Sequence, residues 1–154
     1  MNLAEADIAL TYRSGAGSNN SVVVKLLADS LGAPNSAGVL EQWTVNDIPL
    51  DFQSMIFDLP STSNPFLASG VPYWLAAFPG GNDTIAGWNK NSTRATGVDF
   101  NSDANGTATW TAEPNSTTPA FRIIATPEPS SLLLLGSGLM ALGMTLRRRA
   151  VGLD

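Results

Sequence analysis

The stretch Val22-Val23-Val24-Lys25-Leu26-Leu27-Ala28 decides the fold class of this chain. Side chains alternate between the two faces of a strand, so Val22, Val24 and Leu26 share one face. Segments rich in turn residues flank the stretch on both sides, at residues 14–20 and 32–36. Bounded alternation of this kind predicts a single β-strand.

The same pattern recurs along the chain in both directions. Further strands are expected at residues 7–12, 40–45, 55–59, 73–78, 85–88, 97–100, 107–111 and 120–125. Turn residues separate these segments at regular spacing, and Asn105-Gly106 favours a two-residue hairpin connection. Because no long helical period interrupts them, the sequence predicts an all-β body, an antiparallel, jelly-roll-like β-sandwich over residues 1–125.

Two residue types are missing from the chain, and their absence narrows the chemistry. Without cysteine there is no disulfide, thiolate metal site or Cys nucleophile. Without histidine, the usual general base, the commonest transition-metal ligand and the Ser-His-Asp triad are excluded. Paired carboxylates are available, but their spacing does not identify an acid and a base. We therefore expect a non-enzymatic body that holds no cofactor.

The body is acidic. Residues 1–126 carry eleven acidic and five basic side chains, a net charge of −6. Nucleic acid binds basic surfaces, so this balance argues against a nucleic-acid partner.

The last thirty residues have a different composition. Pro127-Glu128-Pro129 lies in a linker over residues 126–131, and residues 132–146 are apolar except for Ser137 and Thr145. Residues 147–154 begin with Arg147, Arg148 and Arg149. At about 1.5 Å per residue the apolar run spans roughly 22 Å, which is enough for a single short transmembrane helix where the bilayer thins. The arginines should stay in the cytoplasm, which leaves the body outside it.

This order of Pro-Glu-Pro, apolar helix and arginine cluster resembles the PEP-CTERM sorting signal, a tail also called the ice-binding-protein C-terminal domain. The resemblance implies export and recognition of Pro127, Glu128 and Pro129 by an exosortase, a sorting protease or transpeptidase. It also implies cleavage near these residues and passage from an inner-membrane intermediate to the cell surface or extracellular matrix. A permanent tail anchor is the competing interpretation. An ice-binding function would need a flat, regular Thr-rich face, and the threonines show no repeat.

The first residues contrast with this export signal. Residues 1–7 have no basic region and no apolar core of the kind that a signal peptide needs. We expect the reading frame to extend upstream and to supply a signal peptide and a first strand.

The body has a resemblance of its own. The segment Asp29-Ser30-Leu31-Gly32-Ala33-Pro34 precedes Val39-Leu40-Glu41, and Leu67-Ala68-Ser69-Gly70-Val71-Pro72-Tyr73-Trp74-Leu75 follows. This order is similar to bacterial surface domains called choice-of-anchor proteins, type R, over residues 20–125. The resemblance implies fold and address, and no biochemical activity.

One loop has the composition of a calcium site. Asp99, Asn101, Asp103 and Asn105 alternate oxygen-bearing side chains and precede Gly106. Calcium loops use such alternation, but the glycine comes late and no glutamate occupies the twelfth position. A polar hairpin turn is the favoured interpretation over a metal site.

Five aromatic residues could form a platform for stacking sugars: Trp43, Tyr73, Trp74, Trp88 and Trp110. In a β-sandwich such residues more often fill the core. Trp88, near Gly80-Gly81 and Asn89, is the best candidate for an exposed glycan contact. The body is thus expected to be either a carbohydrate- or surface-binding module, with extracellular polysaccharide as partner, or a structural envelope protein.

Overall fold

The computed structural model describes residues 1–12, 20–48, 53–81, 84–102 and 109–127, and also Leu135, Ser137 and Met140. Within these residues the body is all-β and every strand pair is antiparallel, as predicted. The described strands are β1 (Asn2–Tyr12), β2 (Val22–Ser30), β3 (Ala33–Val45), β4 (Met55–Pro60), β5 (Tyr73–Pro79), β6 (Ala86–Trp88), β7 (Thr96–Asn101), β8 (Thr111–Thr117) and β9 (Phe121–Thr126).

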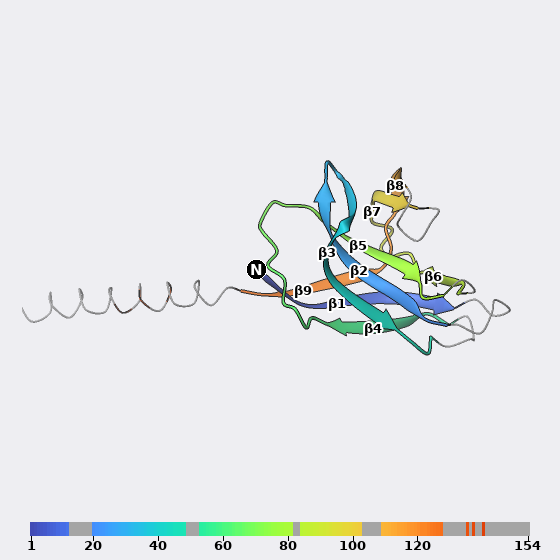
Figure 1. Cartoon of the computed structure of the whole chain (residues 1–154), viewed down its shortest axis with the longest axis horizontal. Coiled ribbons are helices and arrows are strands. Elements are labelled where there is room, and N and C mark those ends of the chain that lie inside the picture. Colours follow the sequence, from blue (N-terminus) through green and yellow to red (C-terminus); the bar gives the residue numbers. More distant parts are fainter. Residues whose placement is uncertain are drawn as a thin grey trace, which may run out of the picture.

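The first sheet is built around β1. One edge of β1 pairs with β4 through residues 5–10. Its other edge pairs with β9 through residues 2–8 and with β6 through residues 10–12. The start of β1 therefore lies beside the end of β9, where Asn2 faces Thr126 (Figure 1).

The second sheet has the order β3-β2-β5, and a tight hairpin joins β2 to β3 (Figure 1). The hairpin turns at Leu31 and Gly32, whose φ angles are 56° and 83°. Two positive φ angles define a type I′ turn, whose twist matches that of the strands. The turn predicted at residues 32–36 is therefore wrong, because Ala33 already begins β3 and Asn35 and Ser36 lie in an irregular part of that strand.

The two sheets share one apolar core. Ile8 and Leu10 of β1 pack with Val22 and Val24 of β2, and Leu59 of β4 belongs to the same cluster. The faces expected from alternation, Val22 with Val24 and Ile8 with Leu10, are the inner faces of the sheets. The opposite face of β1 is also covered, since Asp7 and Ala9 are buried.

A separate two-stranded ribbon, β7–β8, completes the described body. Of the strand expected at residues 107–111, Thr109 and Trp110 precede β8, which begins at Thr111, and residues 107 and 108 lie outside the described residues. The paired strands end at Asn101 and Thr111, so residues 102–110 connect them. The two-residue hairpin expected at Asn105-Gly106 lies outside the described residues.

The last described strand ends beside the Pro-Glu-Pro segment. β9 ends at Thr126, and Pro127 follows it outside any strand. Glu128, Pro129, the arginines at 147–149 and nearly all of residues 132–146 lie outside the described residues. No helix among the described residues is long and apolar enough to span a bilayer.

Candidate functional site

A cleft lies along one side of the body, between β5 of the second sheet and β6 and β9 of the first. Its volume is about 910 Å³. Pockets of about 300–1,000 Å³ are typical of ligand sites. Core residues Leu10, Val22 and Leu26 form part of its lining, so the cleft reaches the space between the sheets.

Aromatic side chains from four strands and one connection line this cleft: Tyr73, Trp74, Phe78, Trp88, Phe100, Trp110 and Phe121. They pack edge to face in pairs. The ring centroids of Trp74 and Phe100 are 4.9 Å apart, and those of Trp88 and Phe121 are 6.4 Å apart. Such pairs add roughly 0.5–1.5 kcal/mol beyond area burial, which holds each ring in a fixed orientation.

The indole N–H groups of all three cleft tryptophans are already hydrogen-bonded. Trp74 Nε1 donates to Asp29 Oδ1 at 2.7 Å, and Trp88 Nε1 donates to the Ala120 carbonyl at 2.9 Å. Trp110 Nε1 donates to Ser36 Oγ at 3.0 Å. A ligand in the cleft would therefore meet the rings through their apolar surfaces.

Polar groups converge on the same cleft. Lys90 Nζ and Asp99 Oδ2 form an ion pair at 2.7 Å, and both residues contribute to the lining. Lys90 also donates to Ser116 Oγ at 3.2 Å. Ser102 Oγ is buried and has no hydrogen-bond partner among the described residues. A buried unpaired hydroxyl costs roughly 1–3 kcal/mol, which a ligand hydroxyl would offset.

Trp88, the candidate glycan contact, lies in this cleft. It is half-buried and packs against the shared core. Trp43 also packs against that core and donates Nε1 to the Pro60 carbonyl at 2.9 Å, but it does not line the cleft. The structure therefore separates the five aromatics, placing Tyr73, Trp74, Trp88 and Trp110 at the cleft and Trp43 elsewhere.

The calcium candidates are only partly described. Asp99 pairs with Lys90, and Asn101 Nδ2 donates to Glu113 Oε1 at 2.6 Å. Asp103 and Asn105 lie outside the described residues. The polar hairpin turn, favoured over a metal site at these four side chains, stays a prediction.

The sequence did not predict two surface features, the aromatic cleft and a group of three carboxylates. The cleft depends on β5 facing β6 and β9, which alternation within one strand does not reveal. The second feature is a group of three carboxylates, Glu5, Asp7 and Asp58. Glu5 and Asp7 are two residues apart in β1 and lie on one of its faces, but the expected strand began only at Asp7. Asp58 joins them only through the β1–β4 register.

The fold and the end of the chain together define an all-β domain whose last strand leads directly into a sorting tail. Residues 125–149 match the PEP-CTERM protein-sorting motif. The motif indicates a secreted surface protein that passes through a membrane-anchored intermediate and is processed by an exosortase. Comparison with curated proteins and with solved structures finds no match, so nothing supports the resemblance of the body to choice-of-anchor type R domains.

Proposed function

We propose that this chain is a non-enzymatic carbohydrate-binding surface protein, which an exosortase releases to the cell surface or extracellular matrix. Its body, a jelly-roll-like β-sandwich, binds an extracellular polysaccharide chain in the cleft between β5, β6 and β9. Pro127, Glu128 and Pro129 are recognised by the exosortase. The apolar helix at residues 132–146 holds the substrate in the membrane, and Arg147, Arg148 and Arg149 orient it.

The aromatic cleft is the observation that supports glycan binding. A pyranose presents an apolar C–H face and a rim of hydroxyl groups. The rings of Trp74, Trp88 and Trp110 offer apolar surface for the C–H face of the sugar, since their N–H groups are already hydrogen-bonded. Hydrogen-bond donors and acceptors for the sugar hydroxyl groups come from Lys90, Asp99 and the Ser102 hydroxyl, which has no partner among the described residues.

The test compares two tryptophans, one inside the cleft and one outside it. Trp88 and Trp43 are both half-buried, both pack against the shared core, and both donate Nε1 to a backbone carbonyl at 2.9 Å. Replacing Trp88 also removes its edge-to-face contact with Phe121, so the unfolding midpoint of each variant is measured beside its binding. Only Trp88→Ala changes the cleft, so the two variants separate binding from stability.

The measurement is binding of the full chain, in nonionic detergent, to an array of bacterial polysaccharides. Glycan binding lost in Trp88→Ala and retained in Trp43→Ala supports the proposal. Loss of one stacking contact should weaken binding at least tenfold, equivalent to about 1.4 kcal/mol. Equal binding by wild type and both variants would remove the cleft from the function.

The second candidate is a structural envelope protein held permanently by its tail. The net charge of −6 over residues 1–126 favours solubility and self-repulsion at a crowded surface without requiring a ligand. This candidate predicts no glycan binding by any variant and an uncleaved tail.

A further inference from the structure

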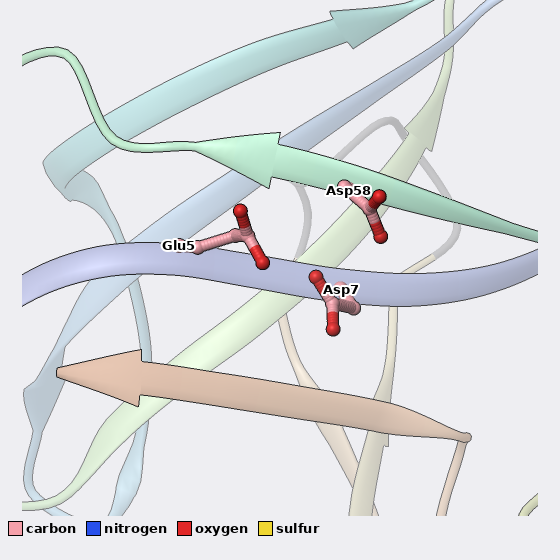
Figure 2. Close-up of side chains that lie close together, drawn as sticks. All are labelled: Glu5, Asp7 and Asp58. Carbon is pink, nitrogen blue, oxygen red and sulfur yellow. The ribbon is translucent and has the colours of Figure 1, made fainter.

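A group of three carboxylates lies on the first sheet, far in sequence from the calcium candidates near β7. Glu5 and Asp7 come from β1, and Asp58 comes from β4, where it pairs with Asp7 in the register. Figure 2 shows the three side chains gathered over the boundary between the two strands. Each can present an oxygen within 4.8 Å of the oxygens of the other two.

This spacing suits a shared cation. Calcium binds oxygen ligands at about 2.3–2.6 Å, so two ligands of one ion are at most about 5 Å apart. The three carboxylates meet this limit without movement of the backbone.

The charges in the cluster are not balanced by the protein. Asp7 Oδ2 forms an ion pair with Arg122 of β9, at 2.5 Å from Nη2. Among the described residues, Arg122 is the basic side chain that forms an ion pair within this group of three carboxylates.

The second carboxylate oxygen of Asp7 supplies an independent indication of a ligand. Asp7 is 4% exposed, and its Oδ1 is buried without a hydrogen-bond donor in the described part of the chain. Arg122 holds Oδ2 on the side of β9, which leaves Oδ1 directed toward Glu5 and Asp58 (Figure 2). A buried anionic oxygen is costly unless a cation or donor meets it.

We propose that Glu5, Asp7 and Asp58 form a binding site for a divalent cation, calcium in the extracellular setting, which joins β1 to β4. The three carboxylates are ligands, and water fills the remaining positions of the six to eight that calcium takes. Arg122 is a positioning residue, because it fixes Asp7 through the oxygen that the ion does not use. With three protein ligands and no enclosing loop, affinity falls in the range of extracellular modules, about 10⁻⁴–10⁻³ M.

The test is thermal unfolding of the full chain in nonionic detergent, followed by tryptophan fluorescence at neutral pH and fixed ionic strength. Calcium chloride is titrated from an EDTA-treated sample to about 10 mM, with magnesium in parallel. The wild type should show a rise in Tm of about 5 °C by about 10 mM calcium, and above about 1 mM the rise should follow the logarithm of the calcium concentration. Magnesium should give a smaller rise, because it demands stricter geometry and keeps its waters.

Asp58→Asn is the decisive variant, since Asp58 is exposed and its loss leaves the core intact. The variant should have a higher Tm than the wild type in EDTA, because one repelling charge is gone, and no rise with calcium. Glu5→Gln should behave in the same way. Glu113→Gln, an exposed acid on β8, is the matched control and should respond to calcium like the wild type.

Three results would overturn the proposal. The first is a wild-type Tm that calcium does not change. The second is an equal rise in Asp58→Asn and the wild type. The third is a rise that survives Asp58→Asn and disappears in Asp99→Asn, which would assign the ion to the segment after β7.

Discussion

At the scale of single residues, Glu41 illustrates how a buried charge is made tolerable. Its side chain is buried in β3, yet it accepts hydrogen bonds from the backbone of Thr62 at 2.6 Å and Ser63 at 3.1 Å. The hydroxyl of Ser61 donates to its other oxygen at 2.5 Å. Burial alone would raise the pKa of Glu41, but these donors outweigh it and lower the pKa. The segment after β4 is thereby tied to the second sheet.

Glu41→Gln is expected to destabilise the body by about 2 kcal/mol, because the amide group turns a donor toward donors. A carboxyl whose pKa is lowered by folding stabilises the protein above its ordinary pKa, and that contribution disappears as the pH falls through the lowered value. The difference in free energy of unfolding between the wild type and Glu41→Gln should therefore become smaller below about pH 4. Urea unfolding at neutral and acidic pH measures both effects. Glu113→Gln should leave the neutral-pH midpoint unchanged, and a constant gap across pH would contradict the role of the charge.

Leu31 occupies a conformation that suits another residue. It is fully exposed at the tip of the β2–β3 hairpin with a φ of 56°. A left-handed backbone costs a residue with a branched side chain roughly 1–2 kcal/mol, whereas Asn-Gly is the preferred type I′ pair. Leu31→Asn should therefore raise stability by about 1 kcal/mol and raise Tm by a few degrees. A lower Tm in calorimetry would show that the leucine stabilises the body by contacts beyond the turn.

At the scale of elements, β9 is attached to the body largely through backbone pairing and one ion pair. Phe121, Ile123 and Ile124 are each more than a third exposed, so apolar burial contributes little to holding this strand. Arg122 instead pairs with Asp7, whose side chain is 6% exposed.

Arg122→Ala should destabilise the body by about 2 kcal/mol, because it leaves the buried Asp7 carboxylate without its cation. Adding Asp7→Asn should restore most of the lost stability, since the uncompensated charge is then removed. Chemical unfolding of the two single variants and the double variant measures this coupling. Additive losses in the double variant would contradict the ion pair as the link between β9 and β1.

The ease of prediction also differs between elements. β2 was predicted because Val22, Val24 and Leu26 alternate along one of its faces, and all three are buried. β8 was misplaced because it contains Pro114 and Asn115, the latter with a φ of 61°, and neither residue is typical of a strand. Its pairing with β7 is irregular between Gly97 and Val98, because Asn115, between Pro114 and Ser116, has no counterpart in the register. Such a ribbon depends on tertiary contacts, including that between Phe100 and Trp74, which local sequence does not contain.

The candidate sites also differ in how far local sequence predicts them. The sorting motif was predictable because it is contiguous, and a short segment carries all of its chemistry. The aromatic cleft and the carboxylate group were not, because each depends on which strands become neighbours. Asp58 lies more than fifty residues from Glu5, and only the register of β1 and β4 brings them together.

At the scale of the whole molecule, the last strand of the body overlaps the start of the sorting motif in sequence. The matched motif begins at residue 125, but Ala125 and Thr126 still pair with β1. A protease needs extended, unpaired backbone around the bond that it cuts, so the sheet limits access from the body side. A flexible Gly-Ser insertion of about four residues between Thr126 and Pro127 should therefore speed processing in an exosortase-bearing host. A pulse-chase measurement that shows slower or equal processing would place the limit elsewhere.

The fate of the tail determines what kind of surface protein this is. Expressed in the same host, the wild-type chain should yield a product whose intact mass ends near Pro127, Glu128 and Pro129, and deletion of the exosortase should leave the tail attached. Glu128→Ala should behave like the deletion, because it removes the charged side chain between the two prolines, whereas Ser130→Ala should be processed normally. Cleavage in the wild type alone would mean that residues 132–146 are an address and that the cleft acts on a released domain. An intact tail in every strain would make residues 132–146 a permanent membrane anchor. The cleft would then face polysaccharide at a fixed, short distance from the membrane, because β9 ends at Thr126, directly before Pro127.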